Sequence, residues 1–258
     1  MNAPAIAFAD WHAHLEDACR GLLAIRSVVA LAETASTQDA PETRAAAAGT
    51  LVTTWRQTAG RGRFGRNWAD TGTEGVAASF VVEAQSSERL ALIGAIAAAQ
   101  ACEAMLGARV GIKWPNDTIV SGRKLAGVLI ERRGELAVIG IGVNVSQDAF
   151  DGELAARATS LAMLGAHADR VAVLCALMRS LDGALAATDE ALVAGFHARD
   201  ALRGTRALFA TPDGPVEGEV RSIDPMRGLV VSTETGERFL PAQSTSVAEW
   251  GGVRVRAL

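Results

Sequence analysis

The order of β-rich and helical runs is the feature that most constrains the fold. The runs "RVGIKW" (109–114), "DTIVSGRKLAGVLIE" (117–131) and "ELAVIGIGVNV" (135–145) follow one another with only short turns between them. This spacing predicts neighbouring antiparallel strands, and Ser121-Gly122 predicts a tight turn within the second run. Because strands and helices do not alternate strictly elsewhere, we expect an α+β fold rather than a doubly wound parallel sheet.

Apolar periodicity and capping residues predict the remaining elements. We expect helices over 9–20, from a turn at "STQDAP" to Gly49, from Ser86 or Ser87 to Gly107, and over 170–200, with strands over 25–34, 51–57 and 75–83. After Gly204, short alternating runs and turn dipeptides predict a small β-barrel. We therefore expect two domains, residues 1–202 and residues 203–258.

Composition limits the classes of function. The chain has 258 residues and a net charge of −4, so we expect no DNA partner bound through an extended basic surface. Cys19, Cys102 and Cys175 show neither zinc spacing nor a disulfide pattern, which favours a reducing cytoplasm. The N-terminus carries acidic residues and does not resemble a signal peptide. The Ala-rich run 90–106 is bounded by charge, so we expect a buried helix and no membrane span.

The segment "GRGRFGR" (60–66) combines three glycines with three arginines. Gly60, Gly62 and Gly65 satisfy the G-x-G-x-x-G pattern of dinucleotide-binding folds, and Glu83 follows about twenty residues later. That pattern requires a helix that opens within the glycines, so that its N-terminus meets the pyrophosphate. The following residues, "NWADTGTEG", have no helical periodicity, so we do not favour a dinucleotide site.

A mobile anion-binding loop is the interpretation that we favour for this segment. Its glycines allow rearrangement over a ligand, and Arg61, Arg63 and Arg66 offer bidentate donors to phosphate or carboxylate. Phe64 and Trp68 could cover an apolar ligand and exclude water. A solvated basic surface loop remains the alternative.

The chain contains two lysines, Lys113 and Lys124, and both lie in "KWPNDTIVSGRK". Their clustering indicates a need for compact ammonium groups, although a general bias toward arginine remains an alternative explanation. Asn116 and Asp117 offer oxygen ligands that suit a Mg²⁺–phosphate group. "GIGVNV" (140–145) adds a glycine-containing strand that could form a close backbone wall of a pocket.

Together, "STQ" (36–38), "WRQTAGRGRFGRNW" (55–68), "KWPNDTIVSGRKLAGVLIE" (113–131) and "GIGVNV" (140–145) resemble the biotin protein ligases in order and spacing. The resemblance covers roughly residues 25–250. It implies an α+β catalytic domain related to class II aminoacyl-tRNA synthetases, followed by an SH3-like barrel.

The resemblance also implies an activity. ATP and biotin, with Mg²⁺, would give biotinyl-5′-AMP and pyrophosphate. The biotinyl group would then pass to a lysine of the biotin carboxyl carrier domain of acetyl-CoA carboxylase or of another biotin-dependent carboxylase. A lipoate or other acyl ligase of the same fold and a non-catalytic biotin-binding protein remain alternatives. We expect no catalytic histidine, because His12, His14, His167 and His197 lie outside the motifs.

Carried over residue by residue, the resemblance assigns the site. Lys124, Arg63 and Arg61 would be catalytic, and Asn116 and Asp117 would lie beside Mg²⁺ through the phosphates. The residues that would bind biotin or the adenylate are Ser36, Thr37, Gln38, Gln57, Gly60, Arg61, Gly62, Arg63, Arg66, Trp68, Lys113, Asn116, Asp117, Lys124, Gly127, Gly140, Gly142, Val143 and Asn144.

Three departures from the family pattern affect these expectations. Gln38 stands where many members have Asn, and it still offers an amide. "RFLPAQSTSV" (238–247) lacks an arginine that some members place near the nucleotide, which puts a nucleotide role of the barrel in doubt. About 25 residues precede the first expected strand, too few for the DNA-binding domain of many bacterial members, so we expect no repressor function.

Overall fold

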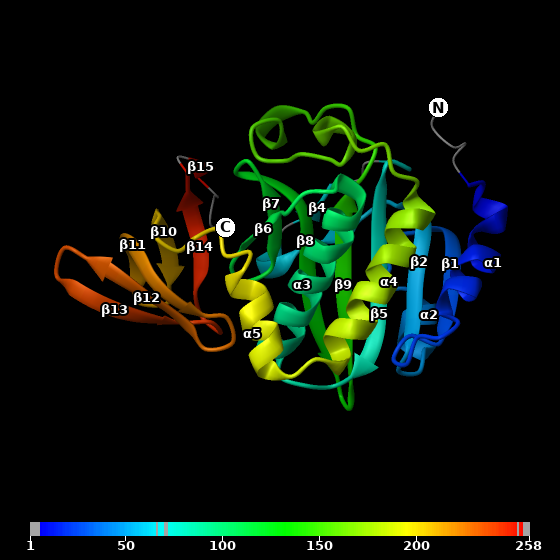
Figure 1. Ribbon diagram of the computed structural model, residues 1–258, viewed down its shortest axis with the longest axis horizontal. Helices are drawn as coiled ribbons and strands as arrows, with labels where there is room; N and C mark the ends of the chain where they lie inside the picture. Colours follow the sequence, from blue (N-terminus) through cyan, green and yellow to red (C-terminus); the bar gives the residue numbers. More distant parts are fainter. Residues whose placement is uncertain (1–5, 66, 70–71, 252, 255–258) are drawn as a thin grey trace.

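The computed structural model describes residues 6–65, 67–69, 72–251 and 253–254, and its larger part is a mixed α+β layer structure (Figure 1). Among the described residues, seven strands form one sheet in the order β1-β2-β5-β9-β8-β7-β6. β1 and β2 are parallel, and the other neighbours in this sheet are antiparallel. The bounds are β1 Ser27–Thr34, β2 Thr50–Gln57, β5 Gly75–Glu83, β6 Gly111–Lys113, β7 Asp117–Val120, β8 Arg123–Arg133 and β9 Leu136–Asn144.

The helices are α1 Phe8–Cys19, α2 Pro41–Ala45, α3 Ser87–Leu106, α4 Arg170–Ala186 and α5 Asp189–His197. Of these, α1, α3 and α4 pack together against one face of the sheet, and α5 packs against α3. Along β9, Ile139, Ile141 and Val143 are fully buried in the core. Because side chains alternate between the two faces of a strand, Gly140 and Gly142 face away from the helices. The sheet therefore presents a glycine-lined surface on its opposite face.

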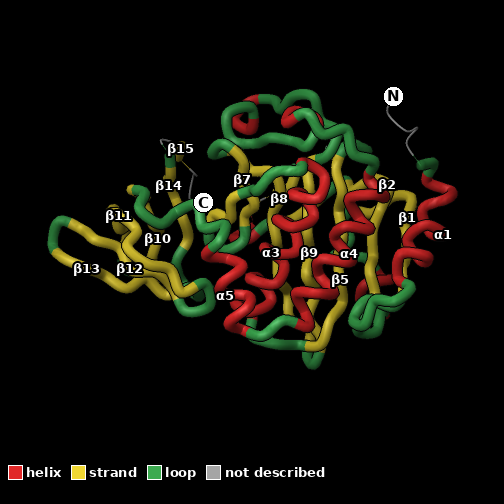
Figure 2. The backbone as a smooth tube through the Cα atoms, in the orientation of Figure 1, coloured by secondary structure: helices red, strands yellow, loops and turns green. Residues whose placement is uncertain are grey.

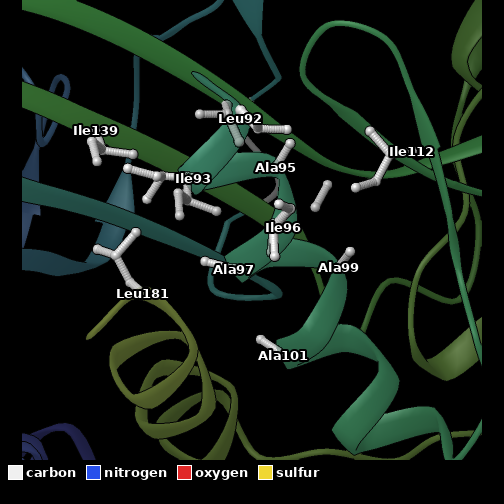
Figure 3. Packing of buried hydrophobic residues seen from close by; sticks show 14 of the residues in the cluster. Leu92, Ile93, Ala95, Ile96, Ala97, Ala99, Ala101, Ile112, Ile139 and Leu181 are labelled. Atoms are coloured by element: carbon white, nitrogen blue, oxygen red, sulfur yellow. The ribbon is translucent and has the colours of Figure 1, made fainter. Parts of the chain in front are cut away.

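α3 is the central helix of the core. The Ser86 hydroxyl caps its start by accepting from the amide of Arg89, and Gly107 ends it in the left-handed conformation. Its small residues allow close packing, since a Cβ on Gly94 would lie 2.6 Å from Val128 and 3.0 Å from Ile139. Figure 3 shows the helix with Ile139 and Leu181 beside it. α3 is long and apolar enough to cross a membrane, but most of it is buried here, as expected of a core helix.

The N-terminal helix α1 packs against β1 and α4 through a tryptophan cluster. The guanidinium of Arg170 lies 4.6 Å from the ring centroid of Trp11 and 4.9 Å from that of Trp55. It also donates to the carbonyls of Thr54 and Trp55. Burial lowers the pKa of Arg170 to about 10, so the group stays charged at neutral pH. This arginine ties the start of α4 and the helix α1 to the end of β2.

Two helical expectations were wrong in extent. The helix expected to reach Gly49 ends at Ala45, because Ala46 is extended and the amide of Gly49 bonds to Val81 beside β2. A short alanine-rich run cannot offset the cost of nucleation without a packed face. The segment 170–200 forms two helices, α4 and α5, and the hydroxyl of Thr188 caps the second.

The C-terminal part forms a separate sheet (Figure 2). Its bounds are β10 Arg206–Thr211, β11 Gly214–Asp224, β12 Gly228–Thr233, β13 Gly236–Pro241, β14 Ser246–Trp250 and β15 Val253–Arg254. Among the described residues its order is β13-β12-β11-β10-β14-β15, with no pairing that joins its two edges. The antiparallel β structure expected after Gly204 is present, but the sheet is open and the closed barrel is not confirmed. The indole nitrogen of Trp114 donates to the carbonyl of Pro225 and joins this sheet to the larger part.

Candidate functional site

The glycine-lined face of the large sheet forms the floor of a cavity of about 160 Å³. A Cβ on Gly142 would lie 2.7 Å from the ring of Trp68, and one on Gly140 would overlap Oε1 of Gln38. A Cβ on Gly127 would lie 2.7 Å from Nζ of Lys124. The three glycines are therefore required for side chains, and for a ligand, to approach the backbone of β8 and β9.

Polar side chains from the turn after β1 and from the end of β2 form one wall, and Ser79 in the middle of β5 bonds to Thr37. Oε1 of Gln57 accepts from the backbone amide of Thr37 at 2.9 Å, and the hydroxyl of Ser79 donates to that of Thr37 at 2.9 Å. Gln38 is buried, and its Nε2 has no hydrogen-bond partner among the described residues. Such a buried donor is costly unless a ligand or water accepts from it. This wall is therefore suited to a ligand with carbonyl-type acceptors.

The Gly/Arg segment, residues 60–68, forms a second wall as a short hairpin. β3, Gly60–Arg61, pairs with β4, Asn67–Trp68, and a 3₁₀ turn over Arg63–Gly65 lies between them. The guanidinium of Arg63 donates to Oδ1 of Asn116 at 3.4 Å. Arg66 lies outside the described residues, as does the side chain of Phe64.

Asp117 binds both lysines of the chain. Its Oδ1 lies 2.6 Å from Nζ of Lys124, and its Oδ2 lies 3.3 Å from Nζ of Lys113. The Asp117 side chain is only 17% exposed. Burial alone would raise its pKa, but the charges of Lys124 and Lys113 outweigh burial and lower the pKa to about 2. Asp117 is therefore ionised at neutral pH and holds two ammonium groups side by side.

A second, more apolar cavity of about 440 Å³ adjoins the first. Both are lined by Asn67, Trp68, Lys113, Asp117 and Lys124. The sequence interpretation missed most of the other residues around the second cavity, which include Phe150, Leu154, Arg157 and Trp250. No motif marks these four, because they come from separate segments that only the fold brings together. The paired lysines thus lie where two ligand-sized spaces meet.

Most of the predicted site residues converge on the first cavity. Those that line it are Ser36, Thr37, Gln38, Gln57, Arg61, Gly62, Arg63, Trp68, Lys113, Asn116, Asp117, Lys124, Gly127, Gly140 and Gly142. Gly60 lies behind it, packed against Gln57 and Trp68. Val143 points into the core, and Asn144 lines the second cavity, where its amide donates to the carbonyl of Thr159. The roles of these residues remain predictions.

The donor set does not fit a metal ion held directly by protein. No group of three or more His, Cys, Asp or Glu side chains within the described ranges could hold one. The oxygen of Asn116 accepts from Arg63, and each oxygen of Asp117 faces an ammonium group. Direct Mg²⁺ ligation by Asn116 and Asp117 would require these partners to separate.

Known proteins resemble the chain in both sequence and structure. The model of the biotin/lipoate A/B protein ligase family matches residues 31–148. The biotin–[acetyl-CoA-carboxylase] ligase of Mycobacterium tuberculosis is 34% identical over 216 residues, which cover 77% of this chain and 80% of that protein. The chain belongs to the biotin protein ligase family.

Two further relatives show how far the likeness extends within this family. The bifunctional ligase/repressor BirA of Bacillus spizizenii is 40% identical over 138 residues, which span 49% of this chain and 42% of that protein. The structure of the Aquifex aeolicus biotin protein ligase in complex with biotin and ATP matches with a TM-score of 0.77 and 26% identity. It covers 85% of this chain and 97% of that one. The mixed α+β fold is thus that of a biotin protein ligase.

Proposed function

We propose that the chain is an ATP-dependent biotin ligase. It activates biotin to biotinyl-5′-AMP and transfers the biotinyl group to a lysine of a biotin carboxyl carrier protein. The meeting of two cavities at Lys113, Asp117 and Lys124 is the observation that carries this proposal. A ligase must bring two anionic substrates together, and clustered positive charge at their junction offsets their repulsion. The names of the Mycobacterium and Aquifex relatives support biotin and ATP as the substrates.

Each cavity fits one substrate. The first cavity offers one unpaired buried donor, Gln38 Nε2, to the ring carbonyl of biotin, with Trp68 over its apolar part. The second offers Phe150 and Trp250 to the base of ATP. The biotin carboxylate and the α-phosphate then meet beside Lys124.

In the first reaction, a biotin carboxylate oxygen attacks the α-phosphorus of ATP. The new C–O–P bond forms as the bond to pyrophosphate breaks, and pyrophosphate leaves. Lys124 and Lys113 bind the oxygens on which negative charge accumulates. Trp68 and the Gly/Arg segment cover the product and keep water from the mixed anhydride. Because the donor set above does not fit a protein-held metal, these steps are assigned to the residues of the chain alone.

In the second reaction, the neutral amine of the acceptor lysine attacks the biotinyl carbonyl carbon. An amide bond forms as the bond to AMP breaks, AMP leaves, and the attacking nitrogen gives up a proton to water. A carboxylate with a pKa of about 2 is a weak base, so Asp117 is better suited to position the two ammonium groups than to accept that proton.

The same proposal includes the two domains, the metal ion that accompanies ATP and the acceptor protein. The larger part, residues 1–202, would be the catalytic domain of the kind related to class II aminoacyl-tRNA synthetases. Residues 203–258 would be an SH3-like barrel that contributes Ser246, Val247 and Trp250 to the cavities. Mg²⁺ would enter bound to ATP, and the acceptor would be the carrier domain of a cytoplasmic biotin-dependent carboxylase.

ATP–pyrophosphate exchange with purified protein and Mg²⁺ tests the proposal, with biotin or lipoate as the only acid. We expect exchange that depends on biotin. Exchange with lipoate alone would show that lipoate, rather than biotin, is the acid that the chain activates by the same chemistry. Absence of exchange with both acids, combined with biotin binding in calorimetry, would identify a non-catalytic binding protein.

A further inference from the structure

A chain of ion pairs joins Arg61, which lines the first cavity, to the turn after β1 and to β8. Nε of Arg61 lies 2.7 Å from Oδ2 of Asp39, and its terminal NH2 lies 2.7 Å from Oε1 of Glu131. The same NH2 donates to Oδ1 of Asp39 at 3.0 Å. One guanidinium is therefore bound by two carboxylates, one from the turn after β1 and one from β8.

The network closes on the wall that carries Gln38. The guanidinium of Arg133 lies 3.3 Å from Oε2 of Glu131 and also donates to the backbone carbonyl of Gln38. The Glu131 side chain is 25% exposed, and that of Arg133 is 28% exposed. These partly buried charges are screened by salt less than fully exposed ones. Glu131 thus joins the Gly/Arg segment to the polar wall.

The Gly/Arg segment has few backbone hydrogen bonds within its own hairpin, although Arg63 donates to Asn116 and Trp68 packs against Gly142. Only two residues of each strand pair in the β3–β4 hairpin. An isolated two-stranded hairpin is marginal in water, and glycines add conformational freedom. Because Arg61, Gly62 and Arg63 line the first cavity, the carboxylates that bind Arg61 also restrain this wall.

We propose that Asp39 and Glu131 are positioning residues that form a latch, which holds the Gly/Arg segment over the first cavity and sets how fast the activated acid escapes. The inference rests on the proposed function, in which that acid is biotinyl-5′-AMP. The latch acts on retention of the intermediate rather than on its formation, since neither carboxylate lines either cavity.

The test compares Glu131→Gln, Asp39→Asn and the double variant with the matched control Glu135→Gln. Glu135 is exposed, and its carboxylate forms no ion pair with the residues that the structure describes. Rapid dilution and separation measure the rate at which preformed biotinyl-5′-AMP leaves the full chain. We expect release to become about two- to fivefold faster in each single variant and about tenfold faster in the double variant. The rate of pyrophosphate exchange and the melting temperature should stay close to those of the unaltered chain.

A second measurement needs no substrate. Trypsin cleaves after arginine, so cleavage within residues 61–66 of the ligand-free chain reports how often the segment opens. We expect faster cleavage in the latch variants and in high salt, and no change in Glu135→Gln. Unchanged release together with unchanged cleavage would overturn the latch. If the unaltered chain catalyses no exchange, the proposed function fails, and the cleavage rates still decide whether the latch exists.

Discussion

At the scale of single residues, Asp117 determines the charge at the junction of the two cavities. Without it, Lys113 and Lys124 would face each other with no carboxylate between them. Like charges in a partly buried site repel, and the carboxylate between the two ammonium groups offsets that repulsion. Asp117 therefore holds the two ammonium groups near each other at the junction of the cavities.

Asp117→Asn should reduce stability in a way that depends on pH. The pKa of Asp117 is lowered from 3.8 to about 2 on folding. A depressed pKa contributes stability above the unfolded value, and this contribution is lost as pH falls through the folded value. Denaturant unfolding should show a deficit of roughly 2 kcal/mol at pH 7. The deficit should shrink between pH 4 and pH 2. A deficit that stays constant across this window would contradict the role of the two lysines.

Lys124→Ala should abolish the first reaction. Nζ of Lys124 contacts Asp117 and lies 5.5 Å from the ring centroid of Trp68, within the lining of both cavities. Removing such a cation should lower the rate of biotin-dependent pyrophosphate exchange by about 10²–10³-fold. Arg132→Ala removes an exposed cation from the same strand and serves as the control. Near-normal exchange in Lys124→Ala would show that Lys124 is not required for the first reaction.

At the scale of elements, the alternation of β8 and β9 builds the site. Isoleucine and valine on one face pack against α3, while Gly127, Gly140 and Gly142 on the other face leave room for Trp68, Gln38 and Lys124. The turn that precedes β8 follows from the sequence, because Ser121 and Gly122 join β7 to β8 and both have positive φ angles, as a tight turn requires. Which glycines face the cavity follows only once the sheet register is known.

Gly142→Ala should fill the floor of the first cavity. Its added Cβ would lie 2.7 Å from the Trp68 ring, so the ring must move and the closed wall is disturbed. We expect at least about tenfold weaker biotin binding by calorimetry, since a bulky side chain that covers a ligand contributes on the order of 1–2 kcal/mol. Gly183 lies on α4, where an added Cβ would meet nothing within 4 Å, so the control variant Gly183→Ala should bind biotin normally. Equal affinities of the two variants would show that Trp68 does not cover the ligand.

At the scale of the whole molecule, the sequence motifs located one cavity and missed most of the other. The first cavity is formed by segments with unusual glycine, arginine and lysine patterns, which are visible without a structure. Phe150, Leu154 and Trp250 carry no such pattern, and they meet because the segment after β9 and the C-terminal sheet lie beside the same strands. Apolar residues at a site look like core residues in a sequence. The missing arginine in "RFLPAQSTSV" (238–247) puts a nucleotide role of this part of the chain in doubt, yet Trp250 from the same part lines the second cavity.

Trp250→Ala should weaken the binding of ATP more than the binding of biotin. The indole nitrogen of Trp250 donates to the hydroxyl of Thr205 at 3.0 Å, which fixes the ring at the edge of the second cavity. Loss of a stacking ring should raise the KM for ATP in pyrophosphate exchange by about five- to tenfold, with little change in the KM for biotin. Trp250→Phe should restore most of the affinity because it keeps an aromatic face. Phe239→Ala on β13 alters a side chain that is 55% exposed in the same sheet, and it should leave both constants unchanged. An equal rise in both KM values for Trp250→Ala would mean that the C-terminal sheet supports the catalytic part as a whole rather than the nucleotide cavity.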